Sequence, residues 1–187
     1  MEGAAEVRYG VPGLACVDEL DLDTLTDHVE HGGHGLIEGH QPILAARKSE
    51  RDTQQAMSRE NVEIVQSYFD AYVAGDPSSA ERFMDPRFEF VPSHTSHVTA
   101  PVLGWKQFNR VLADMANQFE SYEVAPEKII DTGDDRVVVA HRRIAKSHGV
   151  QVEDRLAHVI TVRGGRISRI ASFRSLEEAL EAAGLRE

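Results

Sequence analysis

The spacing of apolar residues changes after Phe119 from a mainly helical period to a period of two, and this change limits the folds that the sequence can adopt. Up to Phe119, apolar side chains recur every three or four residues, as at Trp105, Phe108 and Leu112, and this spacing predicts amphipathic helices. From Tyr122 onward, apolar and polar residues alternate, as they do in half-buried strands. Helices followed by a run of strands predict an α+β fold.

The expected elements follow from these periods and from turn residues. We expect helices at 58–74, 77–84 and 105–119, a first strand around 88–90, strands at 122–130, 136–145, 150–162 and 166–173, and a last helix opened by the capping box at 175–178. The turns that join the last four strands are short and rich in glycine, so these strands should form antiparallel hairpins.

The chain divides into two parts of different character. Residues 1–56 show little periodicity and contain many glycines and prolines, so we expect a weakly ordered extension that ends in a polar run. Residues 57–187 carry all the strong periodic signals and should form one domain. One explanation of the extension is a start codon assigned too early, in which case we expect the protein to begin at Met57.

Composition excludes several classes of function. Lys and Arg total 20 against 31 Asp and Glu, and a net charge of −11 without a basic cluster argues against binding to nucleic acid or to anionic lipid. The lone Cys16 cannot form an internal disulfide. No apolar run is long enough to span a membrane, and no basic segment precedes an apolar stretch at the N-terminus, so we expect a cytoplasmic protein.

Three stretches resemble the SnoaL-like branch of the NTF2-like superfamily. They are 58–65, the tract 68–76 that ends in Ala-Gly-Asp, and the pair of segments 157–159 and 165–167. The resemblance covers about residues 58–185. It implies a cone in which a curved antiparallel sheet wraps against three N-terminal helices, with a C-terminal helix, a conical cavity for a small molecule, and a homodimer formed through the sheet face.

The same superfamily contains the ketosteroid isomerases, and their catalytic groups transfer only in part. Tyr68 matches their hydrogen-bonding tyrosine on the first helix. Val91 stands where they place the general-base aspartate, and Ala157 stands where they place the oxyanion-hole aspartate. With both acids missing, steroid isomerisation by the usual acid pair is not expected.

The resemblance also suggests which face of the long strand 150–162 lines the cavity. If Ala157 faces inward, strand alternation places Arg155 and Val159 inward as well. The same alternation places His158 on the outer face, where it would lie at a dimer interface.

The preceding strand should point His141 and Arg143 into the cavity. A neutral histidine can accept a proton near pH 7, Tyr68 can donate to a developing oxyanion, and an arginine can hold a carboxylate or a phenolate. His141 and Tyr68 are therefore the candidate catalytic residues. The alternative is that His141 and Arg143 pair with carboxylates on the sheet surface.

Further ligand contacts are expected from Arg155, Phe108, Tyr72, Val159, Ile170 and His94. His94 and His97 lie in a loop with no evident third ligand, so we expect His94 at the rim of the cavity and no metal site.

Taken together, the residues and the resemblance predict a protein that binds a small, partly apolar metabolite without a cofactor. It could also catalyse proton transfer, as an isomerase, cyclase or dehydratase does. The alternatives are a non-catalytic dimeric binding protein and an interaction module whose interior is filled by its own side chains.

Overall fold

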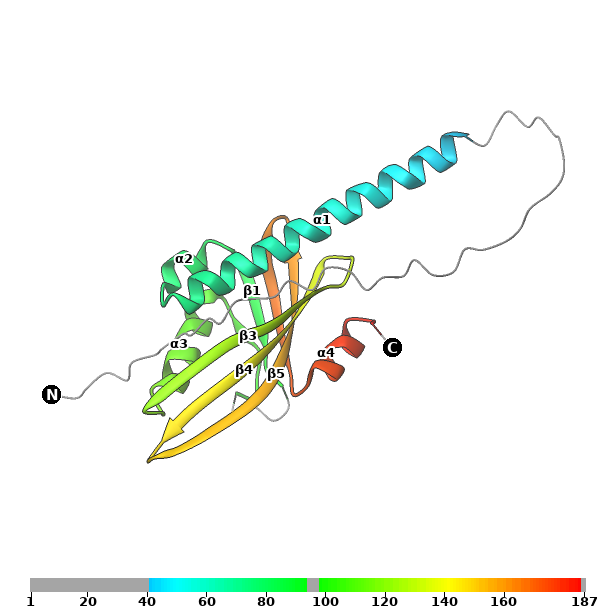
Figure 1. Ribbon diagram of the computed structural model, residues 1–187. Helices are drawn as coiled ribbons and strands as arrows, with labels where there is room; N and C mark the ends of the chain where they lie inside the picture. The colour runs from blue at the N-terminus through cyan, green and yellow to red at the C-terminus, as the bar shows by residue number, and fades with distance from the viewer. Residues whose placement is uncertain (1–40, 94–97, 186–187) are drawn as a thin grey trace.

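The computed structural model describes residues 41–93 and 98–185, with side chains described from Thr53 onward. Along this part of the chain two helices come first, followed by two strands, a third helix, four strands and a last helix (Figure 1). The elements are α1 (Gln41–Val73), α2 (Pro77–Glu81), β1 (Met84–Val91), β2 (Val102–Leu103), α3 (Trp105–Ala116), β3 (Ser121–Asp131), β4 (Arg136–Ser147), β5 (Val150–Arg163), β6 (Arg166–Phe173) and α4 (Leu176–Ala182).

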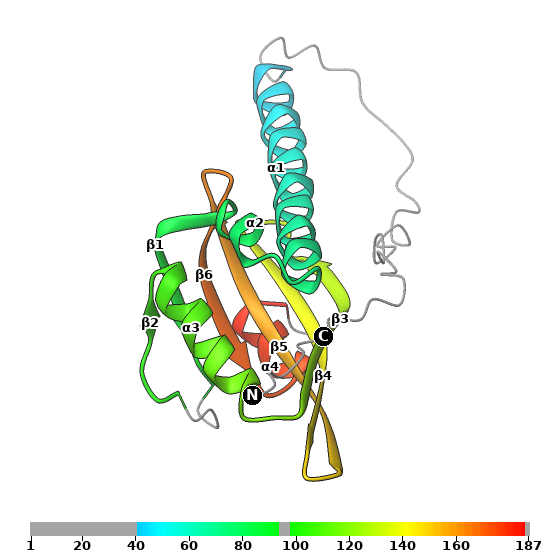
Figure 2. The ribbon, with the colours of Figure 1, turned by 90° about the vertical axis from the view of Figure 1, so that its left-hand side faces the viewer.

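The six strands form one curved sheet in the order β2-β1-β6-β5-β4-β3. Neighbouring strands are antiparallel except β1 and β6, which run parallel. Figure 2 shows α1 and α3 in front of the sheet and α4 behind it. The expected α+β cone is therefore confirmed, and the four strands predicted after Phe119 all form. None of the helices in the described ranges has an apolar stretch long enough to cross a membrane.

The two faces of the sheet bury separate apolar clusters. The larger cluster lies on the concave face, where Val137 and Val139 of β4 and Ile160 of β5 pack against residues of α1 and α3. The smaller one lies on the outer face, where Val138 packs against α4 and its Ala179. Strand alternation explains this division, because neighbouring residues of β4 point to opposite faces.

Helix α1 begins earlier than the sequence indicated. It starts at Gln41 and passes without a break through the predicted domain boundary at 56/57. No glycine or proline interrupts residues 43–74, and the polar run within them is rich in good helix formers such as Arg, Lys, Glu and Gln. Gln54 Nε2 donates to the Gly133 carbonyl over 2.8 Å, so contacts with the domain begin before Met57. The helix crosses the boundary at 56/57, the division into two parts stays a prediction, and residues 1–40 lie outside the described residues.

Local capping signals end and begin the helices as predicted. Gly75 has a φ of 72°, in the left-handed region that glycine tolerates, and the Asp76 amide donates to the Ala71 carbonyl over 3.1 Å to close α1. At α4 the Ser175 hydroxyl accepts from the Glu178 amide over 3.1 Å.

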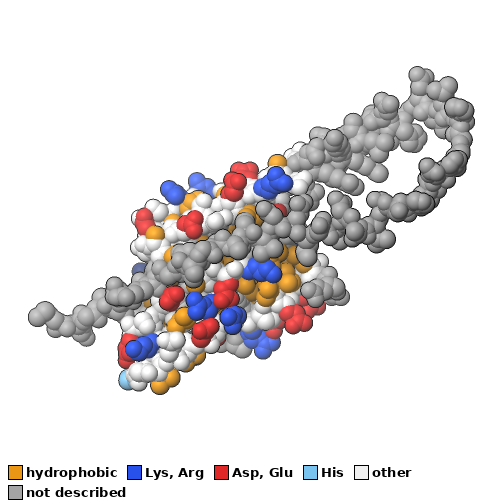
Figure 3. Space-filling view, in the orientation of Figure 1, with side chains coloured by type: hydrophobic (Ala, Val, Ile, Leu, Met, Phe, Trp, Pro, Cys, Tyr) orange, Lys and Arg blue, Asp and Glu red, His pale blue; other side chains and the backbone are white. Residues whose placement is uncertain are grey.

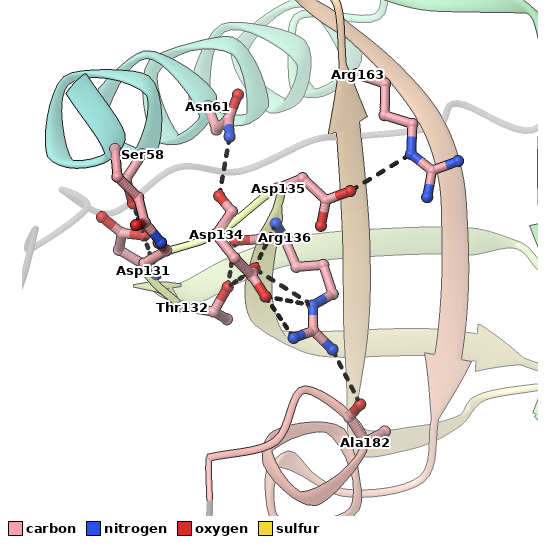
Figure 4. A network of polar contacts seen from close by, with 11 residues as sticks. Ser58, Asn61, Asp131, Thr132, Asp134, Asp135, Arg136, Arg163 and Ala182 are labelled. Carbon is pink, nitrogen blue, oxygen red and sulfur yellow. Dashed lines mark hydrogen bonds and ion pairs between the residues drawn. The ribbon is translucent and has the colours of Figure 1, made fainter. Parts of the chain in front are cut away.

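Polar side chains of α1 attach the helix to the turn between β3 and β4 (Figure 4). Ser58 donates to the Asp131 carboxylate, and Asn61 Nδ2 donates to the Asp134 carbonyl over 3.2 Å. Burial alone would raise the pKa of Asp134, but hydrogen bonds from Arg136 and Thr132 outweigh it and lower that pKa. These contacts hold α1 across the concave face.

Candidate functional site

The register between β4 and β5 defines which side chains share the concave face. Val139 lies opposite His158, and Arg143 lies opposite Asp154. Side chains of paired residues on antiparallel strands point to the same face, and Val139 belongs to the cluster under α1 and α3. His141, which lies between these two rungs, therefore shares the face with His158.

His141 and His158 form a pair of neighbouring rings on this face, with His141 buried and His158 half-buried. Their ring centroids lie 4.3 Å apart, with the rings edge to face. The His141 side chain is fully buried, and neither Nδ1 nor Nε2 has a hydrogen-bond partner; His158 Nδ1 is also buried without a partner. Each buried polar atom without a partner lowers the stability of the fold by about 1–3 kcal/mol. The three nitrogens are therefore hydrogen-bonding groups that the chain itself leaves unsatisfied.

Burial determines the charge of both rings. It lowers the pKa of His141 well below its ordinary value, and the neighbouring His158 lowers it further. Burial also lowers the pKa of His158 to about 4, with a smaller contribution from the positive charge of Arg143. Both imidazoles are therefore neutral at pH 7, and each offers one N–H donor and one nitrogen acceptor.

Aromatic rings surround the histidine pair. The Phe69 ring of α1 lies 5.1 Å from the His141 ring, and the Phe90 ring of β1 lies 6.4 Å from the His158 ring, centroid to centroid. Phe90 in turn packs against Phe108 of α3 at 4.7 Å. The arrangement is an apolar wall with two neutral polar groups in it, which suits a flat organic molecule that carries hydroxyl or carbonyl oxygens.

Arg143 lies on the rung next to His141, toward the β4–β5 turn. Its Nε donates to Asp154 Oδ1 over 2.8 Å, and its Nη2 donates to Oδ2 of the same carboxylate. The hydrogen bonds to Asp154 raise the pKa of Arg143, burial opposes them, and Tyr122 adds to the effect of Asp154. The alternative that Arg143 pairs with a carboxylate is thus confirmed, whereas His141 has no such partner.

The predicted orientation of β5 is wrong by one residue. Arg155 and Val159 lie on the outer face, and His158 lies on the concave face. The Arg155 side chain is 68% exposed and its Nε lies 3.0 Å from Glu127 Oε2, while Val159 packs under α4. Neither can contact a ligand held between α1 and the concave face.

The tight turn between β4 and β5 is the sequence feature that indicates an inward-facing His158. Ser147 pairs with Val150, so the loop contains only His148 and Gly149. A two-residue loop fixes the register of the whole hairpin and pairs every inward odd-numbered residue of β4 with an even-numbered residue of β5. The alignment on Ala157 that the family resemblance suggested contradicted this register.

The other predicted ligand contacts lie in several places. Phe108 and Ile170 are buried in the cluster on the concave face. Tyr68 is buried on α1, where its ring packs edge-on against Trp105 at 6.2 Å, and Tyr72 is half-buried beside it. The residue that contacts His141 is Phe69, which the sequence analysis missed. His94 lies outside the described residues. That a ligand contacts Phe108, Ile170, Tyr68 or Tyr72 stays a prediction.

Comparison with known proteins agrees with this architecture. The curved six-stranded sheet with helices on its concave face is the NTF2-like cone, and the model of the SnoaL-like domain family matches residues 65–170. The chain therefore belongs to the SnoaL-like domain family. Uncharacterised proteins of Mycobacterium tuberculosis and Mycobacterium bovis are 29% identical over 125 residues, which cover 65% of this chain and 94% of theirs.

Solved structures show the same fold at low sequence identity. TerC, co-crystallised with polyporic acid, matches with a TM-score of 0.55 at 22% identity over 67% of this chain and 98% of TerC. A proposed SnoaL-like polyketide cyclase of Jannaschia sp. CCS1 matches with a TM-score of 0.53 at 23% identity, over 69% and 94% of the two chains. An NTF2-like protein of Burkholderia thailandensis gives 0.56 at 19%, over 68% and 97%.

Proposed function

We propose that this protein binds a small, partly apolar organic molecule between α1, α3 and the concave face of the sheet. The observation that carries the proposal is the histidine pair, His141 and His158, with three buried imidazole nitrogens that have no hydrogen-bond partner. Such atoms are rare in folded proteins, because burial without a partner is costly. A ligand oxygen at these rings would satisfy them and recover part of that cost.

The charge of the two rings supports binding of an uncharged oxygen group. Because burial lowers both pKa values, the imidazoles are neutral and can donate to a carbonyl or accept from a hydroxyl. Phe69, Phe90 and Phe108 supply flat apolar contacts around them. A molecule with an apolar body and a hydroxyl or carbonyl group matches both parts of this environment.

Proton transfer is a second candidate function, and the contact between the two rings favours it. With centroids 4.3 Å apart, His141 and His158 could share a proton taken from a carbon next to a carbonyl. Their lowered pKa values make both rings weak bases, and this argues for binding as the primary role. An isomerase, cyclase or dehydratase reaction would need a ligand that raises these pKa values when it binds.

Two measurements test the binding proposal. Native mass spectrometry of the purified full chain should reveal a small molecule that co-purifies. Titration with 2-naphthol, a flat apolar molecule with one uncharged hydroxyl group at pH 7, gives a defined first probe. Replacing His141 or His158 by Phe keeps a ring in place and removes the hydrogen bonds, so affinity should fall about tenfold.

The matched control is His148→Asn. His148 is exposed in the β4–β5 turn with a φ of 50°, a conformation that Asn also tolerates, so this variant should bind like the wild type. Unchanged affinity in both His→Phe variants would contradict the proposal. For the catalytic candidate, a change in a bound compound that disappears in His141→Phe is the expected result; a compound returned unchanged by the wild type argues for binding alone.

A further inference from the structure

Arg143 and Asp154 form the ion pair of β4 and β5 that lies on the concave face of the sheet. The register places these side chains of the two strands on the concave face: Val137, Val139, His141, Arg143, Ala145 and Ser147 on β4, and Ile160, His158, Leu156, Asp154, Val152 and Val150 on β5. With both histidines neutral, Arg143 and Asp154 are the only charged members of this described set. The remaining charges of the two strands, such as Arg142 and Arg155, point to the outer face.

Asp154 occupies the edge of Arg143 that an acidic ligand would use. Both of its oxygens accept hydrogen bonds, one from Nε and one from Nη2. This side-on fork is the arrangement in which arginine holds carboxylates most strongly. The half-buried guanidinium also lies close enough to the histidine pair for its charge to affect His158. A ligand carboxylate at the site would therefore have to displace Asp154.

We propose that Asp154 is a specificity-determining residue, which occupies the Arg143 fork and thereby makes the site select uncharged ligands over carboxylates. This inference rests on the proposed binding function. The paired charges cancel, so the described residues of β4 and β5 leave no unpaired cation on this face to offset the cost of moving an anion out of water. Moving an uncharged hydroxyl or carbonyl group out of water costs less, and the neutral imidazoles of His141 and His158 can satisfy its hydrogen bonds.

A pair of matched probes tests the inference on the full chain. The probes are 2-naphthol and 2-naphthoate, which share a flat apolar body and differ in charge at pH 7. The wild type should bind 2-naphthol more tightly. Asp154→Asn should increase the affinity for 2-naphthoate about tenfold, because the freed Arg143 fork gains a charged partner, and should change the affinity for 2-naphthol less than threefold.

The matched control is Asp135→Asn. Asp135 also pairs with an arginine, Arg163 Nε at 3.4 Å, and its side chain is 45% exposed against 44% for Asp154. This pair lies at the opposite end of the strands, so its loss should not alter the preference. Adding Arg143→Gln to Asp154→Asn should remove the gain in 2-naphthoate affinity, because the cation that causes it is gone.

The outcomes separate the two proposals. If 2-naphthol binds but Asp154→Asn gains no affinity for 2-naphthoate, the role of Asp154 is refuted while the binding site remains. If the gain survives Arg143→Gln, or if Asp135→Asn gives the same gain, the role of the fork is also refuted. If neither the wild type nor any of the variants binds 2-naphthol or 2-naphthoate, the proposed binding site is refuted, and the specificity role of Asp154 is refuted with it.

Discussion

Acid should destabilise this protein through the histidine pair, and His158 allows the effect to be calculated. Its pKa is about 4 in the folded chain against 6.5 for the unperturbed group. A lowered histidine pKa means that the unfolded chain binds the proton more readily, so the folded state loses stability as the pH falls below 6.5. The loss develops between pH 6.5 and about pH 4, and it is complete once the folded ring is protonated too.

The size of the loss follows from the shift. One pKa unit corresponds to about 1.4 kcal/mol, so between pH 7 and pH 4 His158 alone should remove about 3 kcal/mol from the free energy of unfolding. His141 acts in the same direction, because its pKa is also lowered by burial. A loss of this size is a large fraction of the stability of a typical domain.

Urea unfolding of the wild type and of His158→Phe at pH 7 and pH 4 is the assay. The wild type should lose about 3 kcal/mol more than His158→Phe between the two conditions, since the variant has no proton to take up at this position. His148→Asn is the control and should follow the wild type. Equal acid losses in the wild type and in His158→Phe would refute the reasoning, because they would show that burial does not perturb His158.

Three other changes have defined outcomes. Phe69→Ala removes the ring that packs on His141 and should lower the free energy of unfolding by about 4 kcal/mol in urea titrations; a loss below about 1 kcal/mol would contradict the packing. Ser58→Ala breaks the hydrogen bond to Asp131 and should cost about 1 kcal/mol, read from the shift in thermal midpoint, whereas an unchanged midpoint would argue against the contact. The predicted homodimer through the sheet face should dissociate on Arg155→Glu, because this change places like charges on the outer face; sedimentation velocity measures it, and an unchanged dimer would place the interface elsewhere.

The alternating ion pairs on the outer face are relevant to that last prediction. Arg142 lies 3.6 Å from Glu127, and Arg155 contacts the same carboxylate. In Figure 3 positive and negative side chains are interleaved over β3 and β4 rather than separated by sign. A surface of this kind can pair with a second copy of itself only where unlike charges meet, so one charge reversal is a sensitive probe.

The sequence predicts the second half of the fold closely because its signals are local. Alternation, two-residue turns and the cap at Ser175 all act within a few residues, and β3 to β6 and α4 form where they were expected. The start of α1 was less predictable. A polar run without a helix breaker is compatible with both a helix and an extension, and the contact of Gln54 with Gly133 joins residues that are far apart in the sequence.

The candidate site was predictable only in part. His141 and Arg143 were placed on the concave face of β4 from the hairpin and the family resemblance, and they lie there. His158 was missed because the family pattern outweighed the turn at His148, although that turn, together with the orientation of β4, determines which residues of β5 face inward. The fork between Arg143 and Asp154 needed the same register before the sequence could have indicated it.

The parallel pairing of β1 with β6 has a consequence for how the chain reaches its native state. Phe90 of β1 lies beside Ile170 of β6, and the Ile167 amide donates to the Phe83 carbonyl over 2.7 Å. β1 is synthesised well before β6, so the edge of β1 that pairs with β6 stays unpaired until the C-terminal hairpins have formed. Such non-local pairing slows folding. We therefore expect the β3–β6 meander to form first, and the ordered surroundings of His158 to be complete only when β1 joins it last.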